Sequence, residues 1–230
     1  MDQSQHLLVL ANRLEYTFEN IELLNEALTH RSVSSNNNER FEFLGDSILN
    51  FVIADVLFQQ RPDLREGDLS RLRASLVNGE TLAEIARDMN LGDCINLGAG
   101  ELKSGGFRRA SILADTVESI LGAVYCDSDF DTCRALILRL FESRLSNLPD
   151  LDSLKDPKTR LQELLQSRRL SVPFYEVVGV SGKAHAQVFK VRCSIEEIDC
   201  VTQAEGGSRR KAEQHAAEAA YEQVKNKLNV

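Results

Sequence analysis

With 230 residues, 43% of them apolar, the chain is long enough for one medium-sized domain and one small one, and no apolar run is long enough to span a membrane. Five cysteines, an odd number without a Cys-x-x-Cys pair, argue against a disulfide framework or a zinc site and favour reduced thiols in the cytoplasm. The net charge of −8 divides unevenly, with −11 in residues 1–154 and +3 in residues 155–230, which predicts an acidic body with a basic, polyanion-binding appendage.

Residues 1–147 carry helical patterns almost throughout and no strand-like alternation. The apolar periodicity predicts helices over 4–16, 20–29, 38–60, 67–90, 110–126 and 129–146. The pattern fades after Leu145, and residues 148–155 are rich in Asp, Ser and Pro, which is typical of a flexible linker. We therefore predict an all-α domain over 1–147, a linker over 148–155 and a second domain over 156–230.

The helix expected at 38–60 has acids in an otherwise nearly apolar stretch. These acids are Glu39, Glu42 and Asp46. At about 100° per residue they fall within about 60° of one another, and Asn50 extends the same stripe. The rest of the surface is apolar, which is typical of a buried helix, where acids need a proton, a cation or hydrogen bonds. A solvated face is the less favoured interpretation, because the stripe turns apolar at Ile53 and Leu57.

A second apolar helix, expected at 110–126, carries Asp115 and Glu118 on one face. Small residues flank the two acids and would let another helix approach closely; they are Ser111, Ser119 and Gly122. Packed face to face, the two helices would bring together an inner set of four acids, namely Glu42, Asp46, Asp115 and Glu118, with Glu39 farther out. Such an all-oxygen set suits one hard divalent cation, Mg²⁺ or Mn²⁺.

Beyond the linker the pattern predicts a small α+β domain of αβββα order. The expected elements are a helix over 157–169 with Asp156 as its N-cap, strands over 174–180, 185–193 and 198–203, and a helix ending near 228. The first turn of the last helix holds Arg209, Arg210 and Lys211, where the helix dipole disfavours each cation by about 0.3–1 kcal/mol. The triplet alone is equally compatible with solvated cations and with phosphate binding, and the surrounding αβββα pattern favours phosphate binding.

Several segments, taken in order, resemble one family. Residues 38–47 (Asn-Glu-Arg-Phe-Glu-Phe-Leu-Gly-Asp-Ser) resemble the signature of ribonuclease III, with Phe41 where Leu is usual. The other matching segments of the first half are 28–32, 66–70, 100–106 and 114–119. Segments 182–185 and 208–213 resemble parts of a double-stranded RNA-binding domain. The resemblance covers essentially the whole chain and is to the simplest bacterial type, with one catalytic and one RNA-binding domain.

The resemblance implies an all-α endonuclease domain followed by the αβββα RNA-binding domain, in a homodimeric, Mg²⁺-dependent endoribonuclease without an organic cofactor. Mn²⁺ would substitute for Mg²⁺. The enzyme would hydrolyse both strands of double-stranded RNA, leave 5′-phosphate and 3′-hydroxyl ends with short 3′ overhangs, and process rRNA precursors, mRNA and tRNA. Carried over by position, the metal ligands are Glu42, Asp46, Asp115 and Glu118. Of these, Asp46 and Glu118 are catalytic, and Glu39 and Glu66 support the site.

The resemblance also implies which residues contact the duplex. Bases are hidden in the deep major groove of A-form RNA, so such a domain contacts two minor grooves and the phosphates between them. Residues of the first helix would face one minor groove; they are Thr159, Gln162 and Glu163. His185 would enter the next groove. The intervening phosphates would be held by Arg209, Arg210 and Lys211.

Two other functions remain open at this point. The first is a non-catalytic binder of double-stranded RNA with the same architecture, which would have no need to keep every acid. The second is a helical phosphohydrolase acting on nucleotides, although such enzymes usually rely on His-Asp pairs and would leave the RNA-binding half unexplained. For the segment 29–32 we favour a structural role beside the acids over a catalytic one.

Overall fold

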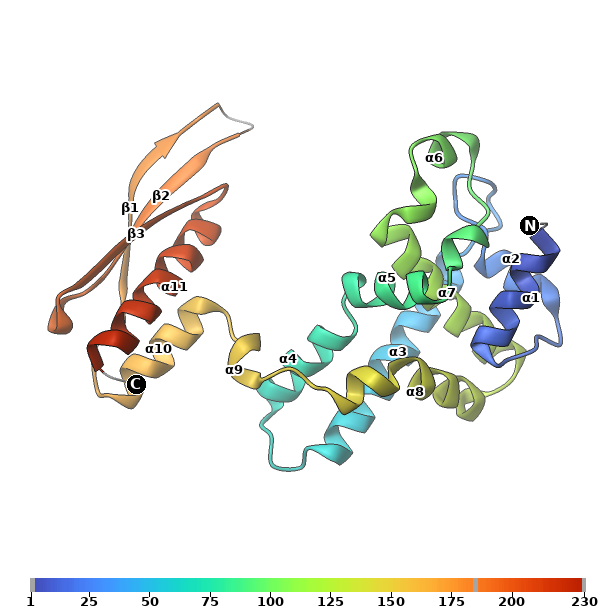
Figure 1. The fold of residues 1–230 in the computed structure, drawn as a ribbon, viewed down its shortest axis with the longest axis horizontal. Helices are drawn as coiled ribbons and strands as arrows, with labels where there is room; N and C mark the ends of the chain where they lie inside the picture. The colour runs from blue at the N-terminus through green and yellow to red at the C-terminus, as the bar shows by residue number, and fades with distance from the viewer. Residues whose placement is uncertain (1–2, 184–185, 229–230) are drawn as a thin grey trace. The chain divides into compact units, whose positions relative to one another are not determined.

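The computed structural model describes residues 3–183 and 186–228, and the chain divides into two compact units, residues 1–149 and 150–230 (Figure 1). Each unit has its own buried core and is considered by itself. Among the described residues, no helix is both long and apolar enough to cross a membrane. All five cysteines are free thiols, and all except Cys126 are buried.

The first unit is built from helices, as the sequence predicts. They are α1 (Gln3–Leu14), α2 (Ile21–Ala27), α3 (Glu39–Gln60), α4 (Glu66–Leu76), α5 (Gly79–Asp88), α6 (Ala99–Lys103), α7 (Ala110–Asp127) and α8 (Phe130–Ser146), with 3-10 turns at Leu91–Asp93 and Gly106–Arg108. The central helix is α7, which packs against α2, α3, α5 and α8 (Figure 1). Because neighbours surround it, most of its residues are buried, including the polar Thr116 and Ser119.

The segment expected as one helix over 67–90 forms two helices, α4 and α5. Asn78 interrupts the pattern and caps α5, because its side-chain oxygen accepts a hydrogen bond from the backbone N–H of Thr81 (3.0 Å). Its side-chain amide also donates to the carbonyl oxygen of Ser75 (2.7 Å). Asparagine favours caps over helix interiors, since its short side chain competes for backbone hydrogen bonds, and the prediction of one helix was wrong for this reason.

One face of α3 contradicts the expectation of a helix buried nearly all round. Ile53 and Leu57 are fully buried, as the apolar end of the acidic stripe suggests. Phe43, Phe51 and Phe58, by contrast, are 78%, 59% and 71% exposed. These three residues share one side of the helix, and we name them the phenylalanine stripe. The pattern of apolar residues could not distinguish a face that packs inside the chain from one that no other element covers.

The second unit has the predicted αβββα order, preceded by a helical turn. Its elements are α9 (Leu151–Leu154), α10 (Pro157–Ser167), β1 (Phe174–Ser181), β2 (Val188–Ile195), β3 (Cys200–Gly206) and α11 (Arg209–Leu228). The antiparallel sheet has the order β1-β2-β3, and Cys193 lies opposite both Tyr175 and Thr202. α11 packs on β2 and β3, and α10 packs on α11 (Figure 1). The face of α11 that meets the sheet is rich in buried alanines, which allow a close approach: Ala212, Ala216, Ala217 and Ala220.

Several boundaries of the second unit differ from the predicted ones, among them those of the second strand, predicted over 185–193 and observed at Val188–Ile195. The third strand starts at Cys200 because Glu196–Ile198 forms a 3-10 turn. The linker predicted as flexible over 148–155 contains the helical turn α9. Within this turn the ammonium group of Lys155 binds the carboxylate of Asp152 (2.8 Å). A segment rich in Asp and Ser therefore gains local order from a side-chain ion pair, which composition does not show.

Candidate metal centre and nucleic-acid interface

The acid-bearing helices α3 and α7 cross at two glycines. A Cβ atom at Gly45 would overlap the main-chain carbonyl oxygen of Glu118, and a Cβ atom at Gly122 would overlap that of Phe41. Only residues without a side chain allow this backbone-to-backbone contact. The sequence predicts the close approach from Gly122 and its small neighbours. Ser119, grouped with them, instead faces α2 and donates a hydrogen bond to the carbonyl oxygen of Ala27 (2.7 Å).

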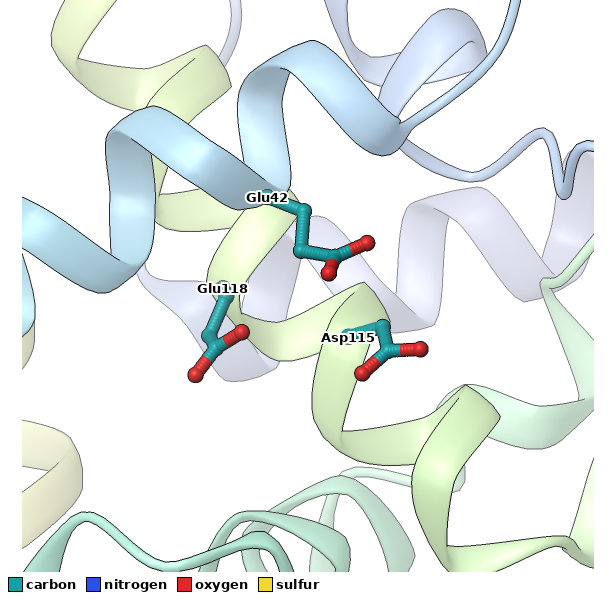
Figure 2. Close-up of side chains that lie close together, drawn as sticks. All are labelled: Glu42, Asp115 and Glu118. Carbon is teal, nitrogen blue, oxygen red and sulfur yellow. The ribbon is translucent and has the colours of Figure 1, made fainter.

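The crossing brings three of the predicted ligands together. Figure 2 shows Glu42 reaching from α3 towards Asp115 and Glu118 of α7. One carboxylate oxygen from each residue lies within 4.8 Å of the other two, and all three residues are half-buried. Oxygens on opposite sides of Mg²⁺ lie about 4.2 Å apart, because each bond is about 2.1 Å long. Small side-chain rotations would close the set, so its geometry and its all-oxygen chemistry fit a hard divalent cation.

The electrostatics of the carboxylate cluster favour the binding of a cation. Burial raises the pKa of Glu118 to about 8, with further contributions from Asp46, Asp115 and Glu42. Burial is also the main cause of the raised pKa of Asp115, and of Glu42, where the charges of Asp115 and Glu39 add to it. Neighbouring carboxylates thus make ionisation of Glu118 and Glu42 less favourable, whereas the charges of His30 and Arg31 lower the pKa of Asp115 and partly offset its burial. A cation held between them would relieve this repulsion and return them to the ionised state.

Asp46 lies beside this group of three rather than within it. Its side chain is exposed, and Asn50 one turn later donates hydrogen bonds to its Oδ1 (2.7 Å) and to its carbonyl oxygen (3.0 Å). Its charge still acts on Glu118, for which it is the largest electrostatic contribution after burial. Asp46 is therefore held at the open side of the cluster, with its orientation fixed by Asn50.

The two acids predicted to support the site lie apart from each other. Glu39 forms an ion pair with Arg31 (3.4 Å) and lines the hollow that also contains Glu42 and Asp115. Glu66, at the start of α4, accepts a hydrogen bond from the hydroxyl of Ser70 (2.8 Å). It lines a different pocket, beside the phenylalanine stripe. Of these two supporting acids, Glu39 lines the hollow beside Glu42 and Asp115, and Glu66 does not.

The hollow also contains residues outside the sets predicted to bind the metal or to support the site. Arg109, just before α7, pairs with Glu101 of α6 (2.9 Å), and both line the hollow. His30 lies in the same wall, in the segment that we interpreted as structural, and its Nδ1 is 2.8 Å from the hydroxyl of Ser32. Glu101 lies in the segment 100–106 that resembles the family, but its pairing with Arg109 has no helical signal, because the loop between α6 and α7 brings the two residues together.

In the second unit, hydrogen bonds join the starts of α10 and α11. Asp156 caps α10 as predicted, accepting from the backbone N–H of Thr159 (3.2 Å), and its Oδ1 accepts from Gln214 of α11 (2.9 Å). Lys158 of α10 pairs with Glu213 of α11 (2.7 Å). The two helix starts therefore form one continuous surface.

Six of the seven residues predicted to contact RNA belong to the described residues. Gln162 and Glu163 are exposed on α10, and the hydroxyl of Thr159 donates to Asp156 (2.6 Å). The cationic triplet is exposed at the start of α11, and it consists of Arg209, Arg210 and Lys211. Arg209 pairs with Glu213 (2.8 Å) in this state. His185 lies outside the described residues.

Comparisons with known proteins agree on both units. A family model described as ribonuclease-III-like matches residues 20–145, and one described as a double-stranded RNA binding motif matches residues 157–224. The chain is 56% identical to ribonuclease 3 of Vibrio cholerae over 217 residues, which cover 94% of this chain and 96% of the relative. It is 57% identical to ribonuclease 3 of Alkalilimnicola ehrlichii over 218 residues, which cover 95% and 96%.

A solved structure also resembles the first unit. The nuclease domain of ribonuclease III from Campylobacter jejuni superposes with a TM-score of 0.59 and 43% sequence identity. The match covers 60% of this chain and 98% of that domain. That structure is described as showing flexibility in a region involved in dimer formation.

Proposed function

The chain belongs to the ribonuclease III family, and we propose that it is a metal-dependent endoribonuclease that cuts both strands of double-stranded RNA. The observation that carries this proposal is the set of three half-buried carboxylates that α3 and α7 bring within 4.8 Å, in a chain whose second unit matches a double-stranded RNA binding motif. A protein that only binds RNA would gain nothing from this cluster, whose mutual repulsion lowers the stability of the fold.

We assign the metal to Mg²⁺, with Mn²⁺ able to replace it, and its ligands to Glu42, Asp46, Asp115 and Glu118. A bound cation of this kind lowers the pKa of water and offsets charge on a phosphate. We assign Asp46 and Glu118 as catalytic residues, whose carboxylates accept hydrogen bonds from the attacking water and orient it in line with the bond to the 3′ oxygen. The products then carry 5′-phosphate and 3′-hydroxyl ends. Glu39 and Glu66 take supporting roles.

The homodimer is proposed from the exposed face of α3. Phe51 and Phe58 belong to the phenylalanine stripe and also line an apolar pocket of about 680 Å³, together with Leu64 and Leu69. Stripe and pocket thus form one mostly apolar surface, which the described residues of the first unit leave exposed apart from a contact between the rings of Phe51 and Phe130 (5.8 Å between centroids). A second copy presenting the same surface would bury it, which is the usual route to a two-fold dimer. Two active sites in one dimer account for cleavage of both strands and for short 3′ overhangs.

Recognition of the duplex is assigned to the surface formed by the starts of α10 and α11. The cationic triplet would hold phosphates at the positive end of the α11 dipole, where the backbone N–H of Lys211 already donates to the hydroxyl of Ser208 (3.2 Å). The exposed Gln162 and Glu163 of α10 would contact ribose hydroxyls of one minor groove, and His185 would contact the next minor groove. Contacts of this kind read the shape of A-form RNA and leave its sequence largely unread.

The proposal is tested by incubating the full-length protein with duplex RNA and Mg²⁺ and mapping the product ends. We expect paired cuts on the two strands, with 5′-phosphate ends and 3′ overhangs. A protein that shifts the duplex on a gel and leaves it intact would be a binder without catalysis. Phosphate release from free nucleotides, with the duplex untouched, would indicate a phosphohydrolase instead. The five free thiols support the proposed cytoplasmic location, and we propose rRNA precursors, mRNA and tRNA precursors as the substrates.

A further inference from the structure

A cation from the segment before α10 contacts the proposed duplex-binding surface directly. The ammonium nitrogen of Lys155 lies 2.6 Å from Oε2 of Glu163 and 2.8 Å from Oδ1 of Asp152. The side chain of Lys155 is only 17% exposed, whereas that of Glu163 is 49% exposed. Lys155 is therefore covered by the RNA-binding unit, although it belongs to the segment that the sequence suggests is a flexible linker.

The backbone next to Lys155 is fixed as well. The following residue, Asp156, accepts hydrogen bonds from the backbone and hydroxyl of Thr159 and from the side chain of Gln214. These bonds attach the chain at this point to both α10 and α11. The backbone that carries Lys155 is thus fixed at the starts of two helices, while its ammonium group is held by Asp152 of the α9 turn and by Glu163 of α10.

Glu163 is the one carboxylate among the seven residues assigned to RNA contact. A minor groove offers ribose 2′-hydroxyls, which can donate a hydrogen bond to a carboxylate, but a free negative charge there would repel the nearby phosphates. The ion pair engages Oε2, and in the part of the chain that the structure describes Oε1 carries no hydrogen bond. The pair therefore offsets the charge of Glu163 while one oxygen stays available to a ligand.

We propose that Lys155 is a positioning residue of the duplex-binding surface, which neutralises Glu163 and orients it so that Oε1 accepts a hydrogen bond from a ribose 2′-hydroxyl. This inference rests on the proposed function. It also assigns the α9 turn to the RNA-binding unit, because Lys155 joins Asp152 of that turn to α10. Lys155 acts through Glu163 and contacts no phosphate itself.

The test is a double-mutant cycle on the full-length protein. Binding to a duplex longer than the about 16 base pairs that such a domain spans is measured by fluorescence anisotropy, without divalent cations so that the RNA stays intact. Lys155→Met keeps most of the aliphatic chain and should weaken binding roughly two- to fivefold, the range of a partly exposed charge pair. In a Glu163→Gln background the same substitution should have almost no effect. Lys155→Arg, which keeps the charge, should bind like wild type.

Lys190→Met is the matched control. It removes the same charge from the same unit, where Lys190 pairs with Glu205 across β2 and β3 (3.8 Å), and should leave affinity nearly unchanged. Thermal melting of each variant verifies the fold. Unchanged or tighter binding by Lys155→Met overturns the inference. Tighter binding would mean that Lys155 shields Glu163 from RNA. Equal weakening in both backgrounds also overturns it, because Lys155 would then contact a phosphate. In that case its loss would reduce the slope of log affinity against log salt concentration by about one released ion. A wild-type protein that binds no duplex would refute the proposed function instead.

Discussion

Gly45 of α3 lies directly against the main-chain carbonyl group of Glu118 in α7. Glu42 precedes Gly45 by one helical turn, so the same contact that joins the helices sets the distance between the carboxylates of Glu42 and Glu118. Gly122 makes the reciprocal contact with the carbonyl of Phe41. The proposed metal centre therefore depends on two glycines, which have no side chain, as well as on the acids.

Gly45→Ala should damage both fold and site. The added methyl group would overlap backbone atoms, which cannot rotate away, and we expect a loss of about 1–3 kcal/mol despite the better helix propensity of alanine. Thermal melting and duplex cleavage measure the two effects. Gly100→Ala is the control, because a Cβ atom there meets nothing within 4 Å. Equal melting temperatures for the two variants would contradict the packing described for α3 and α7.

Glu118→Gln should abolish cleavage while duplex binding persists. The substitution keeps the size of the side chain but removes the charge of a proposed ligand, so we expect cleavage to fall by more than about a hundredfold, beyond the usual effect of residues outside the ligand shell. Cleavage and gel-shift assays on one preparation give both quantities. Glu80→Gln changes an exposed acid of α5 that pairs with Arg87 and should cleave normally. Turnover near the wild-type rate in Glu118→Gln would show that the metal assignment is wrong.

Stability of the metal-free protein should fall as the pH rises from about 5 to about 8. The pKa of Glu118 is raised from 4.5 to about 8 in the fold, so the folded state binds more protons than the unfolded chain between these values. The free energy of unfolding then decreases with rising pH. Melting temperatures measured with a chelator should show this decline, and Glu118→Gln should flatten it.

Added Mg²⁺ should act most strongly at the upper end of that pH range, because a cation binds the ionised carboxylates. We expect the melting temperature to rise with Mg²⁺ at pH 8 and to change little at pH 5. An equal rise at both values would mean that the ion binds elsewhere than at the acids of α3 and α7.

Phe43→Asp should shift the protein from dimer to monomer. The side chain of Phe43 is 78% exposed, so the charge is tolerated in one chain but would be buried against apolar surface in a second copy. Sedimentation velocity across a concentration series reports the assembly state. Leu8→Asp, at an apolar position of α1 that is 67% exposed, serves as the control. A Phe43 variant that remains dimeric would rule out the phenylalanine stripe as the interface.

Removing residues 150–230 should weaken duplex binding sharply at physiological salt and leave some cleavage at low salt. Phosphate contacts release counterions, so their contribution falls steeply as salt rises. The remaining unit, residues 1–149, contains the acid cluster and its own core. Cleavage rates of the truncated and full-length proteins are compared across a salt series. Equal rates at every salt concentration would remove the proposed role of the second unit.

The pattern of apolar residues predicted the helices and strands correctly wherever a single period dominates. The αβββα order and the cap of α10 follow from local signals, namely alternation and an Asp-Pro pair at a helix start. The break at Asn78 was missed because a capping residue competes with an apolar period that continues across it. Helical spacing also placed the acids of α3 and α7 on common faces, since that geometry is fixed by the helix itself.

Which acids meet depends on how the helices pack against each other. The crossing at Gly45 groups Glu42 with Asp115 and Glu118 and leaves Asp46 at the open side, a choice that depends on the angle and rotation of two helices far apart in sequence. The exposure of the phenylalanine stripe and the contact from Lys155 to Glu163 likewise depend on how elements pack, which local sequence does not specify. A periodic pattern records which side of an element is apolar or charged, whereas the neighbour that covers or pairs with that side is chosen by packing across the whole fold.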